Sequence, residues 1–147
     1  MDKNFVDTFE LFVQQSGCDV ELQEFEMIVF LTPAFFTAVS DGYFSKKQKE
    51  IFLGCILGFL DELEEGSVEE DLSLKKVEKD YFTIFSFIKS NRDEWLGRIL
   101  VLLQNIVADD ENLKKIILDT CEKIAEVNGK NNSEDAMIRA MKKFLDW

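Results

Sequence analysis

The chain has 147 residues, of which 46% are hydrophobic, and this is enough to build one domain around a real core. Its 17 basic and 29 acidic residues give a formal net charge of −12. Such a surface repels nucleic-acid phosphates and anionic lipid, and it suits cations or a basic protein partner. Histidine is absent, which excludes Ser-His-Asp triads, Cys-His dyads and histidine-ligated metals.

The cysteines and the start of the chain indicate the compartment. Cys18, Cys55 and Cys121 are scattered and form no CxxC pair, so they are typical of small buried apolar residues in a reducing environment. The first residues carry acids and lack the continuous apolar core of a signal peptide. No uninterrupted apolar run of about 18 residues occurs, so no membrane span is expected. We therefore expect a cytoplasmic protein.

Helical periodicity dominates the chain from its start, and the scarcity of proline and glycine favours a few long helices. Residues 2–15 predict a first helix, which Gly17 ends. Residues 21–31 predict a second. The only proline, Pro33, follows a threonine, and this pair is a helix start signal. We therefore expect a short helix from Pro33 to about Ser40; the alternative is one uninterrupted helix kinked at Pro33.

A tight corner follows this segment. Asp41 and Gly42 are turn residues, and Ser45 is expected to cap a helix that continues to about residue 63. Gly54 and Gly58 lie four residues apart in it. In a membrane this spacing indicates helix dimerisation, whereas in this chain we expect it to allow one close contact between helices.

The middle of the chain continues the helical pattern. Residues 61–71 are mostly acidic and predict a surface connection, with Ser67 in a capping box. Residues 72–89 include the strand-like run YFTIFSFI, but their length and apolar spacing favour a helix. Residues 94–107 are apolar nearly all round, so we expect them to form the buried central helix.

Two helices close the chain. The first covers residues 110–126, and Ser133 is expected to cap the second. Between them, Asn128 and Gly129 form a corner related to the first one. The sequence thus predicts an all-α fold, a compact bundle of about seven helices with two related helix–loop–helix corners, in a single domain over residues 1–147.

Neither corner has the spacing of an EF-hand calcium loop. If Asp41 opened an EF-hand loop, Lys46 would occupy the glycine position and Phe52 the position of the bidentate glutamate. Counting back from either corner glycine fails as well, so no EF-hand is present. Asp41 is read as a turn residue or as one oxygen ligand of a hard cation.

The sequence contains no other motif that indicates catalysis or phosphate binding. The chain has no glycine-rich phosphate loop, no GxSxG and no HExxH. Among 29 acids no pair stands out as acid and base. No catalytic residue is therefore assigned.

Two segments resemble a known family. The segment 35-FFTAVSDGYFSKKQKEIF-52 resembles the first repeat of tellurite-resistance TerB-like domains, with an apolar helix, a turn ending in Ser-Asp-Gly, a short loop, a serine cap and a charged helix start. The segment 116-IILDTCEKIAEVNGKNNSEDAMIRAMKKFL-145 is similar to the second repeat. The resemblance implies a seven-helix, cytoplasmic, non-catalytic domain that is tied to stress response and binds divalent metal through acids at its corners.

The family's metal-binding positions carry over in part. Asn128 stands where the family has a second aspartate, and Lys46, Lys47 and Gln48 stand where acids are expected. The positions that the resemblance leaves for a metal are Asp41, Asn128, Glu134 and Asp135.

The expected function follows from these features. The leading hypothesis is a TerB-like binding or scaffold module that binds another protein, without catalysis or a cofactor, and without nucleic acid as a partner. The alternative is a binding domain or sensor for a divalent cation such as calcium. A third hypothesis is an enzyme that uses only carboxylates.

Overall fold

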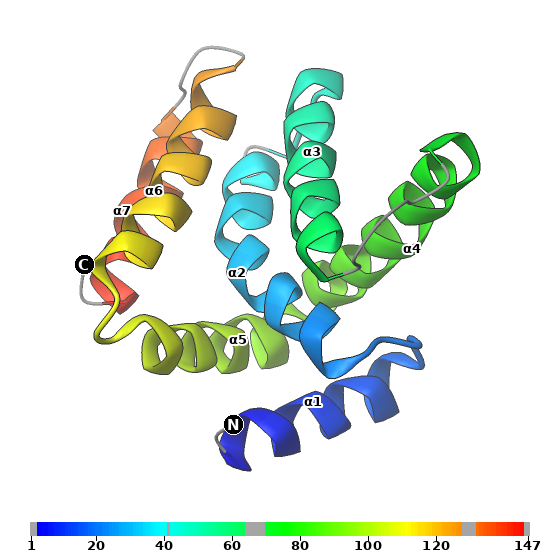
Figure 1. Ribbon diagram of the computed structural model, residues 1–147. Helices are drawn as coiled ribbons and strands as arrows, with labels where there is room; N and C mark the ends of the chain where they lie inside the picture. Colours follow the sequence, from blue (N-terminus) through cyan, green and yellow to red (C-terminus); the bar gives the residue numbers. More distant parts are fainter. Residues whose placement is uncertain (1–2, 41, 64–69, 128–131, 146–147) are drawn as a thin grey trace.

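The computed structural model describes residues 3–40, 42–63, 70–127 and 132–145. These residues form seven helices and no strand (Figure 1). The helices are α1 (Lys3–Ser16), α2 (Leu22–Val39), α3 (Lys46–Leu63), α4 (Glu70–Ser90), α5 (Arg92–Val107), α6 (Glu111–Glu126) and α7 (Asn132–Leu145). The predicted all-α class is confirmed, and the described helices agree with the expected number.

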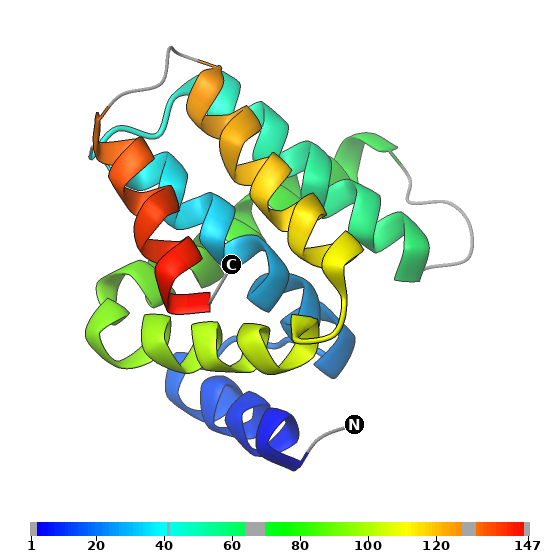
Figure 2. The same ribbon diagram turned by 90° about the vertical axis from the view of Figure 1, so that its left-hand side faces the viewer.

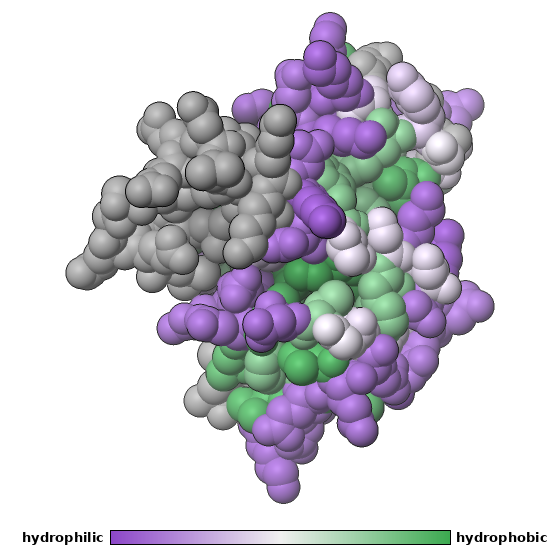
Figure 3. Space-filling view, turned by 90° about the vertical axis from the view of Figure 1, so that its right-hand side faces the viewer, coloured by the Kyte–Doolittle hydropathy of each residue, from purple (hydrophilic) through white to green (hydrophobic). Residues whose placement is uncertain are grey.

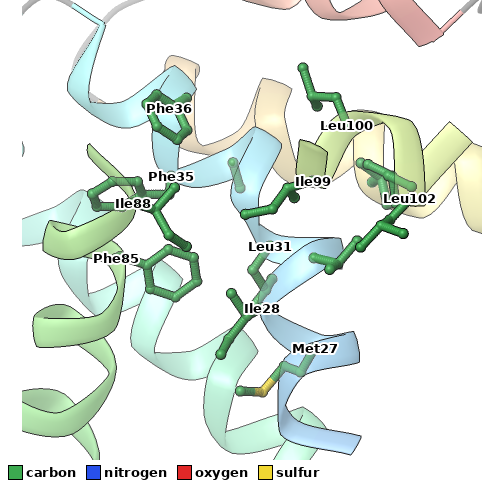
Figure 4. Close-up of a cluster of buried hydrophobic side chains, with 14 of the residues drawn as sticks. Met27, Ile28, Leu31, Phe35, Phe36, Phe85, Ile88, Ile99, Leu100 and Leu102 are labelled. Atoms are coloured by element: carbon green, nitrogen blue, oxygen red, sulfur yellow. The ribbon is translucent and has the colours of Figure 1, made fainter. Parts of the chain in front are cut away.

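The fold is organised around α2, against which each of the other described helices packs (Figure 1). Residues 31–38 of this helix are all buried. Figure 4 shows its Leu31 and Phe35 among apolar side chains that include Phe85 of α4 and Ile99 of α5. A helix covered on all sides must be apolar on all sides, and the middle of α2 meets that condition.

The expectation that residues 94–107 form the central helix is wrong. These residues lie in α5, which buries one face, including Trp95 and Leu103, and leaves the other in solvent. On the open face Val101 is 42% exposed. The apolar composition of α5 exceeds what its position requires.

The expectation that a new helix starts at Pro33 is also wrong, because α2 continues through that residue. Proline has no N–H, so the helix loses one backbone hydrogen bond there, at a cost of about 3 kcal/mol. Burial of the flanking side chains offsets this cost, since each large apolar side chain contributes about 1.5–3 kcal/mol. Thr32 and Thr37, both fully buried, donate their hydroxyl hydrogens to the carbonyls of Ile28 and Pro33 at 2.7 and 2.8 Å.

Among the described helices, α2 is long and apolar enough to cross a membrane by length and composition. In the structure 67% of that stretch is buried inside the protein. The core helix of a globular domain has the same character, because it too is surrounded by apolar groups.

The described residues that follow Asp41 in the first corner adopt the predicted turn and cap. Gly42 has φ of 83°, a left-handed conformation that glycine adopts without strain, and its N–H donates to the Val39 carbonyl at 3.0 Å. Ser45 caps α3, because its Oγ accepts the Gln48 N–H at 3.1 Å. In return the Gln48 Oε1 accepts the Ser45 N–H at 3.0 Å, which completes a capping box. Gly17 likewise ends α1, with φ of 68°.

Other local expectations are corrected. Gly54 and Gly58 make no close contact with another described helix, because a Cβ built on either would meet none of the described atoms within 4 Å. Ser133 is not a cap, since α7 already includes Asn132. Of the three cysteines only Cys121 is fully buried.

Some predictions fall outside the described residues. They concern Asp41, the capping box at Ser67, and the second corner at Asn128 and Gly129. The proposed relation between the two corners is therefore untested and stays a prediction.

Candidate functional site

Two of the predicted metal ligands lie in the first turn of α7. Glu134 is only 1% exposed, and Asp135 is half-buried. The Glu134 Oε2 accepts a hydrogen bond of 2.7 Å from the Gln48 Nε2, from a residue 86 positions earlier in the chain. The structure therefore joins the starts of α3 and α7, which carry the charged turns that follow the two corners.

Gln48 holds this junction with all of its amide groups. Its Nε2 also donates to the Ile124 carbonyl near the end of α6, at 3.2 Å, while its Oε1 is used in the Ser45 capping box. A side-chain amide has two N–H donors, and here they go to two different helices. The bond to a carboxylate is the stronger kind, because the acceptor is ionised when Glu134 is deprotonated.

In the sequence, Gln48 stands where the resemblance to TerB-like domains leads us to expect an acid. Its spacing from Ser45, S-x-x-Q, was the available signal for the capping box. No local signal indicated the long-range partners, because they depend on how the helices pack.

Four residues were predicted to form a cation site, and the structure describes two of them. Among the described residues no group of three or more acidic or cysteine side chains could hold a metal ion. Asp41 and Asn128 lie outside that part of the chain. The site of Asp41, Asn128, Glu134 and Asp135 therefore stays a prediction.

A groove of about 500 Å³ lies between α3 and α6, which run alongside each other in Figure 2. We call it the α3–α6 groove. It is lined by Ile51, Gly54, Cys55, Ile116, Asp119, Thr120 and Lys123. Most of this lining is apolar, although it lies at the surface.

Two features make the α3–α6 groove unusual. Ile116 is 58% exposed, whereas its neighbour Ile117 is buried in the core. Gly54 lines the groove, and a Cβ built on it would meet no described atom within 4 Å. Gly58 lies one helical turn further along α3, outside the lining, and is equally open to the described residues. The sequence pointed to these glycines, but they open the surface of α3 outward instead of bringing two internal helices together.

Cys55 in this groove is not a reactive thiol. Burial raises its pKa above the ordinary value, and the nearby Lys123 charge opposes this effect only in part. The thiol is therefore protonated at neutral pH, and the thiolate is the nucleophilic form. The cysteine contributes apolar surface to the groove.

A second hollow, of about 660 Å³, lies beside α4 and gathers the carboxylates of Asp19, Glu24 and Asp80. Asp19 and Asp80 are exposed. Glu24 uses both oxygens in structural bonds: Oε1 accepts the Glu21 N–H at 3.2 Å, and Oε2 accepts the Tyr81 hydroxyl. The half-buried Glu24 thus joins α4 to α2 through Tyr81. The hypothesis of a carboxylate-only enzyme stays a prediction.

Comparison of the chain with protein-family models, curated proteins and solved structures returned no match. The resemblance to TerB-like domains therefore stays a prediction from short motifs. A helical bundle supports many functions, so function has to be argued from the surfaces described above.

Proposed function

We propose that the chain is a non-catalytic, TerB-like helical module that binds another protein in the cytoplasm, in a stress-response setting. The α3–α6 groove is the observation that carries this proposal. A surface groove with a mostly apolar lining and a large apolar side chain left in solvent offers apolar contacts to a partner segment. The exposed Ile116 supplies that side chain.

The shape of the groove favours a helix as the partner element. Gly54 lines the groove without a side chain, so a second helix can come close to the α3 backbone there. Ile51 and Ile116 flank the opening and offer apolar contacts on both sides. This is the geometry in which an amphipathic helix lays its apolar face into a groove.

The charge of the chain favours a partner helix with basic flanks. The net charge of −12 attracts a basic segment and accelerates its encounter with the protein. The occupant we propose is therefore an amphipathic helix whose apolar stripe is bordered by lysine or arginine.

The test compares two surface variants. Ile116→Glu places a charge in the groove, while the matched Val101→Glu changes the exposed face of α5. We expect wild type and Val101→Glu to capture the same partner from native cells. The isolated partner helix should bind Ile116→Glu at least about tenfold more weakly in calorimetry, because a central apolar anchor is lost.

The proposal fails if Ile116→Glu retains the partner with unchanged affinity. It also fails if Val101→Glu weakens binding to the same extent, because the effect would then come from added negative charge and not from the groove. Circular dichroism of both variants checks that the fold is retained.

A further inference from the structure

A further pocket, of about 670 Å³, lies where α4 meets the end of α2 and the start of α3. We call it the lysine pocket. It is lined by Phe35, Val39, Phe44, Lys49, Glu78, Lys79, Phe82, Ser86 and Lys89. Figure 3 shows the face of the molecule on which α4 lies, where apolar surface is exposed between hydrophilic side chains.

The floor of the lysine pocket is aromatic. The Phe44 ring lies 5.8 Å from the Phe35 ring and 5.6 Å from the Phe82 ring, both in edge-on arrangements. Phe35 is buried, whereas Phe44 and Phe82 are only partly covered. Aromatic rings with free surface favour a flat apolar ligand that packs against them.

The rim of the lysine pocket is basic. Lys49, Lys79 and Lys89 are exposed, and none of them forms an ion pair with a described residue. The Lys49 Nζ lies 5.7 Å from the centre of the Phe44 ring, so the charge is held beside the aromatic floor. Glu78 is the one acid in the lining. The lining therefore carries an excess of positive charge in a protein whose net charge is −12.

We propose that the lysine pocket binds a small organic anion with an aromatic body and a carboxylate group. Ligand sites combine a mostly apolar lining with a few polar groups that orient the ligand. In this proposal the phenylalanines receive the ring, and the long lysine side chains on the rim reach the carboxylate. The site is separate from the α3–α6 groove and does not depend on protein binding there.

Titration with three probes tests the ligand chemistry. The probe is 1-naphthoate, and the references are neutral 1-naphthalenemethanol and inorganic phosphate. We expect 1-naphthoate to bind at least about tenfold more tightly than either, because it alone uses both the floor and the rim. Amide shifts of Phe44, Phe82 and Ser86 in NMR spectra should move with its binding. Equal binding of the neutral alcohol, or of phosphate, would overturn the proposal.

Matched variants test the place. Lys79→Gln/Lys89→Gln should weaken 1-naphthoate binding about tenfold, since two charge interactions are lost. The control Lys47→Gln/Lys115→Gln removes the same charge from exposed positions outside the lining. Equal weakening in the control pair, or unchanged binding in the rim pair, would overturn the proposal.

A third variant blocks the space itself. Ser86 is exposed on α4 and lines the pocket, so Ser86→Trp should fill it without disturbing the core. We expect 1-naphthoate binding to be lost while the circular dichroism spectrum stays that of wild type. A folded Ser86→Trp variant that binds 1-naphthoate as tightly as wild type would place the ligand elsewhere.

Discussion

Gln48 connects three helices from a buried position. It completes the cap of α3 with Ser45, donates to a carbonyl of α6, and donates to the carboxylate of Glu134 on α7. Buried polar groups are stable only when they are paired, so each partner depends on the others. A neutral amide here joins two charged helix starts.

Removing this amide should destabilise the fold. Gln48→Ala breaks the cap and leaves a buried carboxylate with one donor fewer, so we expect the free energy of unfolding to fall by about 2–4 kcal/mol. Gln48→Glu should cost at least as much at neutral pH, because it sets two carboxylates against each other. Urea unfolding measures both variants. The exposed Gln23→Ala is the control, and a Gln48→Ala variant as stable as this control would contradict the role described.

The buried thiol of Cys121 makes the stability of the fold depend on pH. Burial raises the pKa of its thiol from 9.0 to about 12, although a hydrogen bond with Thr37 opposes this effect. Because the folded-state pKa is the higher one, the unfolded chain loses this proton first as the pH rises. The thiol's contribution to stability is complete below pH 9.0 and is lost as the pH rises towards 12.

This contribution can be isolated by substitution. Between these limits the wild type should lose up to about 1.4 kcal/mol per pH unit more than Cys121→Val, which has no proton to release. Urea unfolding of both proteins at several pH values from neutral to alkaline gives the difference, and other titrating groups cancel. Identical pH dependence of the two proteins would contradict the assignment.

The predicted cation site is decided by calorimetric titration with calcium and magnesium. Glu134 already accepts a bond from Gln48, and lysines stand where two acids were expected. We therefore expect no saturable heat above that of Asp41→Ala. Saturable binding to the wild type that Asp41→Ala removes would instead establish the divalent-cation alternative.

At the scale of elements, two helices contain residues that normally disfavour a helix. α2 crosses Pro33 without ending, because the surrounding helices bury both of its halves. α3 contains Gly54 and Gly58 between its two ends, although a glycine within a helix lowers the stability of that helix. A destabilising glycine whose missing Cβ would meet no described atom within 4 Å is consistent with a role in binding.

Alanine at these glycines should stabilise the protein. A Cβ at Gly54, Gly58 or Gly97 meets nothing within 4 Å, so each Gly→Ala variant should raise the free energy of unfolding by about 1 kcal/mol. Gly97 lies on the exposed face of α5 and is the matched control. Thermal unfolding measures the gain.

The same variants separate stability from binding. Gly54→Ala and Gly58→Ala should weaken the proposed partner helix, because the added methyl groups keep it away from the α3 backbone. Gly97→Ala should bind it as wild type does. Equal binding by all three variants would contradict close approach at α3.

At the scale of the whole molecule, repulsion between negative charges opposes the apolar burial that stabilises the fold. Six helices pack around α2 in the described part of the chain, while the net charge of −12 acts against compaction through self-repulsion. Only two ion pairs join described residues: Arg98 with Glu94 in α5, and Lys114 with Glu111 in α6. Neither pair links two different helices. Stability therefore rests on apolar burial.

The melting temperature should depend on the salt concentration, because salt screens this repulsion. Raising sodium chloride from about 0.02 M to about 0.5 M screens the repulsion, so we expect the melting temperature to rise by a few degrees. The same change should slow association with a basic partner helix. Differential scanning calorimetry measures the first effect, and a melting temperature that falls with salt would contradict it.

The local pattern of the sequence determined the helices and several of their ends. The caps at Ser45, Gly17 and Gly42 could be predicted because they depend on residues within one turn. Apolar periodicity also predicted the helix over YFTIFSFI, in α4, despite its strand-like composition.

Only the tertiary structure decided which helix lies at the centre. The sequence predicted two helices in place of α2, because Pro33 is a helix start signal in the middle of its apolar pattern. The tertiary structure also decided that Gly54 and Gly58 open outward and that Gln48 meets Glu134 across 86 positions. The physical reason is the same in each case. Periodicity and capping act over a few residues, whereas burial depends on which helix faces cover one another, and that is settled only when all of them pack together.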